Sequence, residues 1–190
     1  MELSYKNITI SGKIAVGTTT LAKNLSKIIG WKHVNAGFIQ REYDRKNHIH
    51  ENMQGASARS DEHEKGIEAM TKRLLIEKHH LVYEAWLSGF VARKIPQVLK
   101  ILVVCSEDAI RVDRVVNREN ISVEEAKQWI KQREEENINK WKKLYGDYDF
   151  WDRKYYDLVI DTYSSGRLET LGKVLDKLGF PHDNLSTIVT

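Results

Sequence analysis

The residues best suited to chemistry near the start of the chain are two glycines followed by three threonines. Gly12 and Gly17 stand five positions apart, and Thr18, Thr19 and Thr20 follow at once. In this spacing, GxxxxGx[ST], a glycine-bounded turn points successive N–H groups inward, and the helix that follows adds the positive end of its dipole. Such a concavity binds phosphate groups, so residues 12–17 are called the phosphate loop from here on.

The phosphate loop lacks the lysine that usually follows its second glycine. That lysine reaches the β- and γ-phosphates of a nucleotide, and the Ser or Thr after it ligates Mg²⁺. Here Thr19 keeps the metal-ligand position, whereas Thr18 stands in the lysine position and carries no charge. We hypothesise that Lys13, inside the loop, supplies the missing ammonium group. The alternative interpretation of this motif alone is a glycine-containing turn in an ordinary strand-helix unit.

Charged residues further along the chain suit the same chemistry. Glu84 ends an apolar stretch, and a carboxylate at the end of a strand can hold Mg²⁺ through water or orient a substrate. Arg111, Arg114 and Arg118 recur at three- and four-residue spacing, which places their guanidinium groups on one helix face. Three aligned guanidinium groups can neutralise a phosphoryl group during its transfer. The alternatives are a strand-end ion pair for Glu84 and a solvated helix face for the arginines.

The apolar pattern indicates strands that alternate with helices. We expect strands at residues 6–11, 32–35, 80–85, 99–105 and 157–162, of which the fourth is the most apolar and therefore central. Amphipathic or capped stretches predict helices at residues 17–29, from 36, at 64–78, after 106, at 122–145 and at 164–178, with residues 86–89 as a loop. Asn35, Ser106 and Ser122 are the expected helix caps. This order is typical of an α/β fold, in which a parallel sheet of about five strands lies between layers of helices.

The composition sets limits on the class of protein. A chain of 190 residues fits one domain, and 30 Lys+Arg against 27 Asp+Glu give no general reason to bind nucleic acid. The single Cys105 cannot form an internal disulfide, and we expect it to be buried, as suits a reducing cytoplasm. No apolar run approaches the roughly 20 residues that a membrane span needs. We therefore expect a soluble, cytoplasmic protein.

Two stretches allow more than one interpretation. Residues 47–64 are polar and contain His48, His50 and His63, whose irregular spacing is a poor signature of a metal site. We expect this stretch to be a mobile segment that covers a substrate. The aromatic residues between Tyr145 and Tyr156 are expected to form core beneath a loop, rather than a platform on which bases stack.

Taken together, the motifs resemble those of the cytidylate kinases, especially the short type common in archaea. The resemblance covers nearly the whole chain, and its motifs occur in the same order. The matching stretches are residues 8–22, Asn35-Ala36-Gly37 with Arg41, Glu84 with Leu87-Ser88-Gly89, Arg111-Val112-Asp113-Arg114, Arg118-Glu119, residues 122–126, Arg133-Glu134-Glu135, Leu144-Tyr145-Gly146 and residues 156–162.

The resemblance implies a nucleoside monophosphate kinase, a P-loop three-layer sandwich with a helical lid. In that family the γ-phosphoryl group of ATP, as its Mg²⁺ complex, moves to CMP or dCMP. The chain would then be a single domain with a core (residues 1–35, 80–106 and 157–179), a monophosphate-binding segment (about 36–79) and a lid (about 107–145). Its expected partners are small nucleotides, with no nucleic acid and no membrane, and we expect a monomer.

The resemblance also implies roles for particular residues. Lys13, Arg111, Arg114 and Arg118 would be catalytic, and Arg41 would hold the acceptor's monophosphate. Arg133, Asn137 and Lys140 would meet the phosphate and ribose of the acceptor. Thr19 and Glu84 would hold the metal, and the loop after Thr162 would border adenine. The expected ATP-binding residues are Gly12, Lys13, Ile14, Ala15, Val16, Gly17, Thr18, Thr19 and Thr20.

The chain departs from the family pattern at several positions that carry charge. Thr18 replaces the loop lysine, Phe38 stands where the family often has Asp, Trp86 replaces an arginine, and Lys140-Trp141 replaces Arg-Tyr. These departures leave two alternatives beside the kinase. One is a nucleotide-binding protein of the same fold whose catalysis is impaired. The other is a kinase that acts on a different small acceptor.

Overall fold

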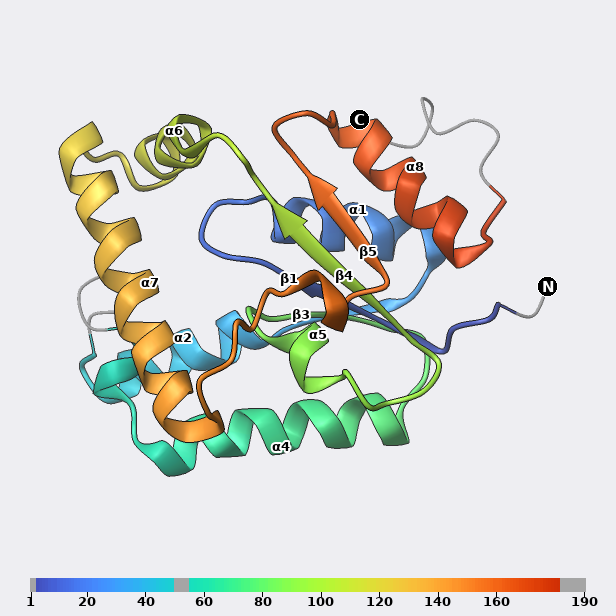
Figure 1. The fold of residues 1–190 in the computed structure, drawn as a ribbon, viewed down its shortest axis with the longest axis horizontal. Coiled ribbons are helices and arrows are strands. Elements are labelled where there is room, and N and C mark those ends of the chain that lie inside the picture. Colours follow the sequence, from blue (N-terminus) through green and yellow to red (C-terminus); the bar gives the residue numbers. More distant parts are fainter. Residues whose placement is uncertain (1–2, 50–54, 182–190) are drawn as a thin grey trace.

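The computed structural model describes residues 3–49 and 55–181, and residue 50 and part of the expected covering segment lie outside these ranges. Five strands form one parallel sheet in the order β2-β3-β1-β4-β5, shown in Figure 1. Their bounds are Asn7–Ser11 (β1), Lys32–Asn35 (β2), Leu81–Glu84 (β3), Val98–Val104 (β4) and Leu158–Asp161 (β5). The predicted α/β fold with about five parallel strands is confirmed.

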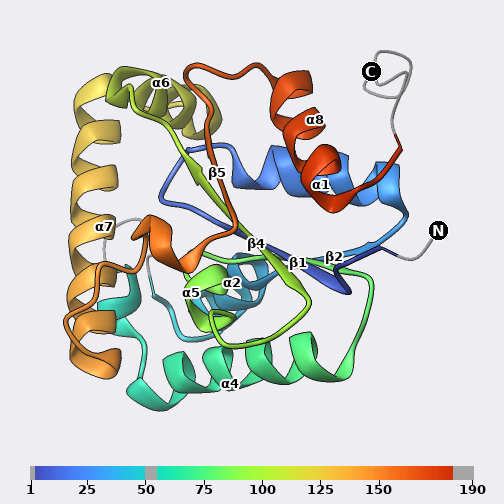
Figure 2. The ribbon, with the colours of Figure 1, turned by 45° about the vertical axis from the view of Figure 1, so that its right-hand side comes forward.

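Helices cover both faces of the sheet, as Figures 1 and 2 show. The α-helices are α1 (Thr18–Ile29), α2 (Ala36–Lys46), α4 (Asp61–Glu77), α5 (Ser88–Val91), α6 (Asp108–Glu119), α7 (Val123–Tyr145) and α8 (Arg167–Leu178). Two short 3-10 helices are η1 (Gly55–Ala58) and η2 (Arg153–Tyr155). Helices α1 and α8 lie together on one face, α4 runs below the other, and α7 stands at the side of the sheet.

The core follows from the apolar pattern of the central strands and of the helices that cover them. On the face of α1 and α8, fully buried Ile8 and Ile10 pack in one cluster with Leu25 and Leu175. The opposite face is covered by α4, whose Leu75 packs against Tyr83. Because β1 is buried at all five positions, it lies in the middle of the sheet and holds the phosphate loop at its end.

The ends of the helices test the expected caps. Asn35 caps α2 by accepting a bond from Phe38 N, and Ser122 forms a capping box with Glu125, as predicted. The expected cap at Ser106 is wrong. Glu107 caps α6, while the Ser106 N–H donates to the Asp161 carboxylate at 3.0 Å. The loop expected at residues 86–89 is wrong in its second half, where the short helix α5 begins.

The aromatic stretch near the C-terminal end of α7 forms core, as expected. Fully buried Phe150 packs edge-on against Phe90 of α5 and near Trp141 of α7. Tyr148 differs, because 41% of it is exposed. Cys105 is buried and unpaired. Among the described helices, none combines the length and the apolar character that crossing a bilayer would require.

Candidate active site

The carbonyl groups of the phosphate loop are held by side chains from elsewhere in the chain. Arg111 Nε donates to Ile14 O at 3.0 Å, and Arg114 Nη1 donates to Ala15 O at 2.9 Å. Thr162, just after β5, donates to Val16 O at 2.8 Å. Since these oxygens are bound on the outer side of the loop, its N–H groups are the polar atoms left to meet an anion in the cleft.

The two loop glycines are required by geometry. A Cβ added at Gly12 would lie 2.5 Å from the Val16 side chain and 2.7 Å from Val103 O, both closer than real Cβ contacts. Gly17 has φ 104°, a conformation that L side chains rarely adopt, and it precedes the first turn of α1. The glycines therefore allow the loop to pass close to β4 and to place the first turn of α1 beside the cleft.

Glu84, at the end of β3, joins the phosphate loop to the neighbouring strand. Its Oε1 accepts hydrogen bonds from the hydroxyl groups of Thr18, at 3.0 Å, and Thr19. Its Oε2 accepts from Asn35 Nδ2 at 2.7 Å and lies 3.0 Å from His33 Nε2, both on β2. Burial raises the pKa of Glu84, but the bonds from His33 and the two threonines outweigh it and lower the pKa below its ordinary value. The carboxylate is therefore charged at neutral pH.

These contacts show how the structure uses the residue that stands in the lysine position. Thr18 does not extend over the loop as a lysine would, because its hydroxyl group donates to Glu84. The Thr19 hydroxyl donates to the same carboxylate oxygen, so the hydroxyl of Thr19 and the carboxylate of Glu84 are neighbours at the edge of the cleft. Among the described residues there is no group of three or more His, Cys, Asp and Glu that could hold a metal ion alone. A metal here would need ligands from a bound nucleotide as well.

A large, strongly basic cleft opens around the phosphate loop. Its volume is about 880 Å³, and it lies where the order of the strands reverses, beyond the carboxyl ends of β1 and β3. Among the described residues that line it, six are basic and two are acidic. The basic ones are Lys13, Arg41, Arg114, Arg118, Arg133 and Arg167, and the acidic ones are Glu84 and Glu119. This excess of positive charge suits a ligand with several phosphate groups.

Two of the cleft cations rest on tryptophan rings. Lys13 Nζ lies 5.1 Å from the ring centre of Trp151, and the Arg133 guanidinium lies 5.7 Å from that of Trp86. The two rings are neighbours, with centres 6.3 Å apart, and Trp151 Nε1 donates to Trp86 O at 3.2 Å. Lys13 thus lines the cleft, as expected, but its ammonium group rests on an aromatic surface.

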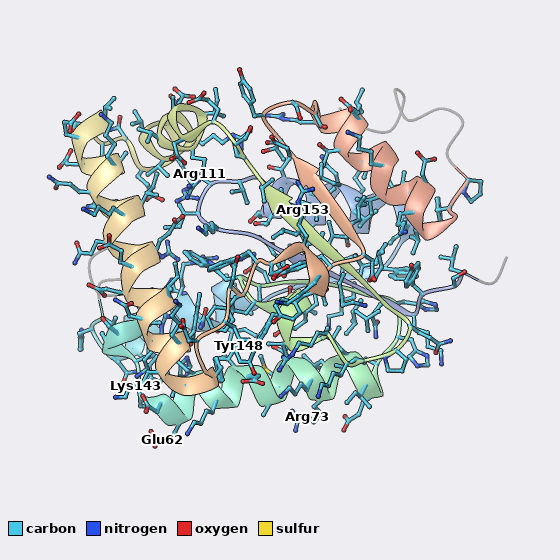
Figure 3. All side chains as sticks on the ribbon, in the orientation of Figure 1. Glu62, Arg73, Arg111, Lys143, Tyr148 and Arg153 are labelled. Atoms are coloured by element: carbon cyan, nitrogen blue, oxygen red, sulfur yellow. The ribbon has the colours of Figure 1, made fainter. Side chains whose placement is uncertain are left out.

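The three arginines of α6 have separate places. Arg114 and Arg118 line the cleft, and Arg118 also pairs with Glu119 at 2.7 Å. Arg111, labelled in Figure 3, is only 8% exposed and is not among the cleft residues. It binds the loop carbonyl of Ile14 together with carboxylates of α6 and α7. Arg111 therefore supports the phosphate loop in this structure, and the catalytic role expected from the sequence stays a prediction.

The residues expected to bind the acceptor also separate into two groups. Arg41 lines the cleft and lies near the first turn of α2, where a Cβ at Gly37 would be 3.4 Å from its Nη1. Arg133 lines the same cleft. Asn137 and Lys140 do not, which differs from the expectation. Asn137 accepts a bond from Ala56 N at 2.6 Å, and Lys140 Nζ donates to Arg59 O at 2.9 Å and to Asp61.

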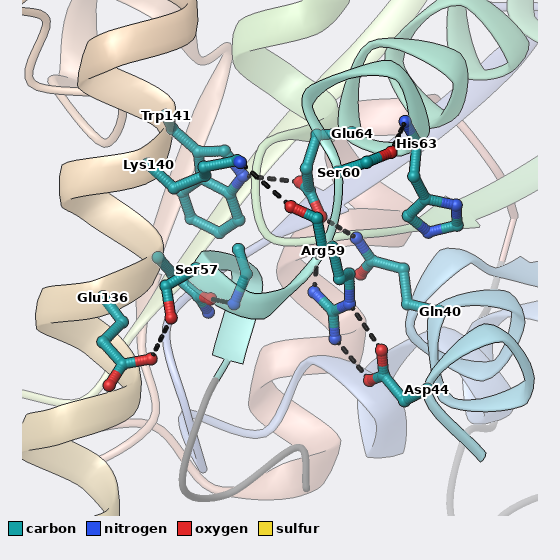
Figure 4. A network of polar contacts seen from close by, with 12 residues as sticks. Gln40, Asp44, Ser57, Arg59, Ser60, His63, Glu64, Glu136, Lys140 and Trp141 are labelled. Atoms are coloured by element: carbon teal, nitrogen blue, oxygen red, sulfur yellow. Dashed lines mark hydrogen bonds and ion pairs between the residues drawn. The ribbon is translucent and has the colours of Figure 1, made fainter. Parts of the chain in front are cut away.

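Asn137 and Lys140 belong to a polar network between α7 and the segment before α4, shown in Figure 4. At its centre Arg59 makes a two-bond contact with Asp44 of α2, at 2.6 and 2.7 Å, and lies 3.4 Å from Glu64 of α4. Glu64 also accepts a bond from Trp141 Nε1 at 2.9 Å. Asp44, Arg59 and Glu64 are all buried, so α2, α4 and α7 are joined by charge-assisted bonds within the protein interior.

Several functional candidates were absent from the sequence-based expectations. Arg167 lines the cleft from the first turn of α8, and Gln40 lines it from α2, next to Arg41. His33 was overlooked, although it contacts Glu84. The position of Arg167 just after the last strand could have indicated it, since that loop was expected to border a ligand. The sequence pattern could not have indicated His33, because its contact with Glu84 depends on β2 lying beside β3 in the sheet.

Several known proteins are similar to this chain in sequence. A family model described as the cytidylate kinase-like family matches residues 7–164. A cytidylate kinase of Thermococcus sibiricus is 35% identical over 161 residues, which are 84% of this chain and 80% of that protein. A cytidylate kinase of Pyrococcus abyssi is 37% identical over 156 residues, which are 82% and 83% of the two chains.

Solved structures are similar in fold at low sequence identity. A gluconokinase from Sinorhizobium meliloti has a TM-score of 0.61 at 9% identity, with 94% of each chain covered. A shikimate kinase from Acinetobacter baumannii has a TM-score of 0.56 at 15% identity, with 91% of this chain and 92% of that chain covered. An uncharacterised protein from Eubacterium ventriosum reaches 0.68 at 13% identity, covering 92% and 98%. At these identities the likeness concerns the fold alone.

The lowered pKa of Glu84 predicts how stability changes in acid. Because the folded-state pKa lies below the ordinary value of 4.5, the charged carboxylate stabilises the fold above that value. This contribution is lost as the pH falls through the lower folded-state pKa. We expect the free energy of unfolding of the wild-type protein to fall more steeply from about pH 5 to pH 3 than that of Glu84→Gln. Urea titrations at each pH measure it, with Glu135→Gln, at an exposed position, as the matched control. Parallel curves for wild type and Glu84→Gln would contradict the prediction.

The contacts of Lys140 predict a structural effect of its removal. Lys140→Ala leaves the Arg59 carbonyl and the Asp61 carboxylate without their ammonium donor, so it should lower the free energy of unfolding by about 1–3 kcal/mol. Lys143→Ala, on the exposed side of the same helix (Figure 3), is the control and should change it by less than about 0.5 kcal/mol. Equal effects of the two substitutions in urea denaturation would show that the network contact is unimportant.

Proposed function

Because the chain belongs to the cytidylate kinase-like family, we propose that its cleft transfers the γ-phosphoryl group of ATP to the monophosphate of CMP or dCMP. The chain is an ATP-dependent phosphotransferase of the nucleoside monophosphate kinase class, as its family and its relatives indicate. The choice of cytidine nucleotides as acceptors is the proposal.

On the donor side, the phosphate loop and the start of α1 bind the phosphates of ATP. The bonds from Arg111, Arg114 and Thr162 to the loop carbonyl groups support this role, because they leave the loop N–H groups to the nucleotide. Arg114 and Arg118 neutralise the charge that spreads over the transferred group. Thr162, Ser165 and Gly166 also line the cleft, and in the proposed complex they border the adenosine end of the nucleotide.

Mg²⁺ fits the pair formed by Thr19 and Glu84. Hard oxygen ligands suit this ion, which usually takes one or two protein ligands and completes its shell with phosphate oxygens and water. Thr19 and Glu84 would hold the ion, the carboxylate directly or through water, and the ion would supply positive charge to the phosphate groups of the donor. This chain's own residues position the reactants.

On the acceptor side, Arg41 and Arg133 bind the acceptor's monophosphate. They line the cleft from α2 and α7, whereas Arg114 and Arg118 line it from α6. Asn137 and Lys140 do not touch the acceptor in this proposal. They fix α7 against the segment of residues 56–61 and so set the position of Arg133. Transfer is then direct, because two phosphate groups held in line by fixed cations need no covalent enzyme intermediate.

The observation that carries the proposal is that cations from the phosphate loop, α2, α6, α7 and α8 line one cleft. So much positive charge around one phosphate loop suits two ligands that each bear phosphate, a donor and an acceptor.

One specific observation favours a second candidate, a nucleotide-binding protein with impaired catalysis. Thr18 takes the lysine position and donates to Glu84, so no cation of the loop stands at that position itself. Trp86, in place of an arginine, favours the related possibility of a kinase for another small acceptor. Both alternatives keep ATP binding and differ from the leading proposal in turnover and in acceptor.

The deciding experiment measures ADP release from ATP and Mg²⁺ with CMP, dCMP, UMP, AMP, GMP, shikimate and gluconate, each against a blank without acceptor. We expect CMP or dCMP to stimulate release most strongly. Stimulation by another compound alone would replace the acceptor in the proposal. If none stimulates while calorimetry still detects ATP binding, the nucleotide-binding alternative is the correct one.

Lys13 should supply the charge that Thr18 lacks. Lys13→Ala is expected to reduce kcat by about a hundredfold, which corresponds to about 3 kcal/mol of lost electrostatic stabilisation in the transition state. Lys13→Arg keeps the charge and should retain more activity, and Lys94→Ala, at an exposed position, is the control. A change in kcat within threefold for Lys13→Ala would refute this role.

A further inference from the structure

A second, smaller cavity opens beside the cleft, and we call it the side slot. Its volume is about 50 Å³, and it shares Gln40, Ala85 and Trp86 with the cleft. The slot extends from this shared mouth between α4, α5 and α7. Its remaining walls are Ala36, Glu64, Ile67, Glu68, Thr71, Leu87, Ser88, Val91, Trp141 and Tyr145.

The side slot is narrow and mostly apolar, with a few polar groups. Its volume has room for roughly four water molecules, which matches the edge of one six-membered ring better than a fused double ring. Trp86 and Trp141 stand nearly edge to face, with ring centres 5.5 Å apart. An apolar slot with a small number of placed polar groups is the usual design of a site that selects a small ring.

Two carboxylates, Glu64 and Glu68, are among the polar groups that line the slot. Glu68 interacts with the Tyr145 hydroxyl and pairs with Lys72, four positions further along α4, at 2.5 Å. Burial, together with the charges of Glu68 and Glu64, raises the pKa of Tyr145 far above its ordinary value, so the phenol keeps its proton. Glu64 has both oxygens engaged, by Arg59 and Gln40 on one side and by Trp141 on the other. Glu68 is therefore the carboxylate with more capacity to accept another hydrogen bond.

Gln40 links the slot to the phosphate-binding side of the cleft. It precedes Arg41 on α2, so the two side chains leave the same turn of helix, and both line the cleft. The Gln40 amide donates to Glu64 over 3.4 Å, which is long for a hydrogen bond and weak enough to be exchanged. Because the two cavities share Gln40, Ala85 and Trp86, the slot is continuous with the part of the cleft that Arg41 lines.

We infer, on the basis of the proposed function, that the side slot binds the acceptor's pyrimidine base and that Glu68 selects a base with an exocyclic amine. The amine of cytosine donates to the Glu68 carboxylate, and the ring nitrogen beside it accepts from the Gln40 amide. Uracil presents a carbonyl oxygen in place of the amine, so it brings an acceptor against a carboxylate. Purine bases are disfavoured because their second ring exceeds the room in the slot.

The experiment compares CMP with UMP as acceptors for the wild-type protein and for Glu68→Gln. The amide of the variant can donate as well as accept, so it can bond to the carbonyl of uracil. We expect the wild-type protein to prefer CMP, and the ratio of kcat/KM for CMP to that for UMP to fall at least tenfold in Glu68→Gln. Glu77→Gln, at an exposed position on the same helix, is the matched control and should leave the ratio unchanged.

Two further measurements keep the outcomes distinct. Calorimetric binding of CMP and UMP, without ATP, tests the slot apart from turnover and should show the same loss of preference. Gln40→Leu is a second variant, in case Glu68→Gln does not fold, and it should raise KM for CMP at least tenfold and leave KM for ATP within twofold. An active wild-type protein whose CMP preference survives Glu68→Gln overturns this inference and leaves the proposed function standing. A wild-type protein that phosphorylates neither nucleotide overturns the proposed function itself.

Discussion

The buried carboxylate of Glu84 is the contact on which the geometry of the site depends. It collects hydrogen bonds from Thr18 and Thr19 at the start of α1 and from His33 and Asn35 at the end of β2. Burying a carboxylate without partners is very unfavourable, whereas each hydrogen bond to a charged group returns about 1.5–3 kcal/mol. The charge therefore remains buried only while β2, β3 and the phosphate loop keep their relative positions. The order of the sheet makes this possible, because β3 lies between β1 and β2.

A second set of buried charges positions the other half of the cleft. Arg59 joins Asp44 of α2 to Glu64 of α4. From α7, Trp141 donates to Glu64 and Lys140 donates to the Arg59 carbonyl, so α7 is joined to the same network. Removal of one partner from such a network leaves an uncompensated buried charge, which commonly costs 3–5 kcal/mol, so its members hold one another in a single arrangement. Helix α7 also contacts α6 through Arg111 and Glu134. Helix α7 thus carries Arg133 and also contacts α6, which carries Arg114 and Arg118, so we infer that a movement of α7 would shift all three arginines.

The strands, most helix caps and the phosphate loop could be predicted from the sequence because they depend on neighbours within a few residues. The capping box of Ser122 and the glycine turns are of this local kind. The roles of Arg111 and Lys140 could not be predicted, since helical spacing identifies a shared face but not what that face meets. Arg111 meets the loop carbonyl of Ile14, 97 positions away, and Lys140 meets Arg59, 81 positions away. The expected cap at Ser106 was wrong for a related reason, because the distant Asp161 binds both its side chain and its backbone N–H, and the helix begins after Glu107.

The tryptophans explain how the cleft keeps its positive charge although two cations of the family pattern are missing. Lys13 rests on Trp151 and Arg133 on Trp86. A cation on an aromatic ring gains about 0.5–1 kcal/mol at a site open to water, and the ring does not neutralise it. A carboxylate in the same place would cancel the charge and compete with phosphate. Because hydrogen bonds between a cation and phosphate are stronger than this contact, an incoming phosphate can draw Lys13 from its ring at small cost. In the proposed complex Lys13 can therefore move from Trp151 to a phosphate group, so the absence of a lysine at position 18 is compatible with the proposed phosphate site.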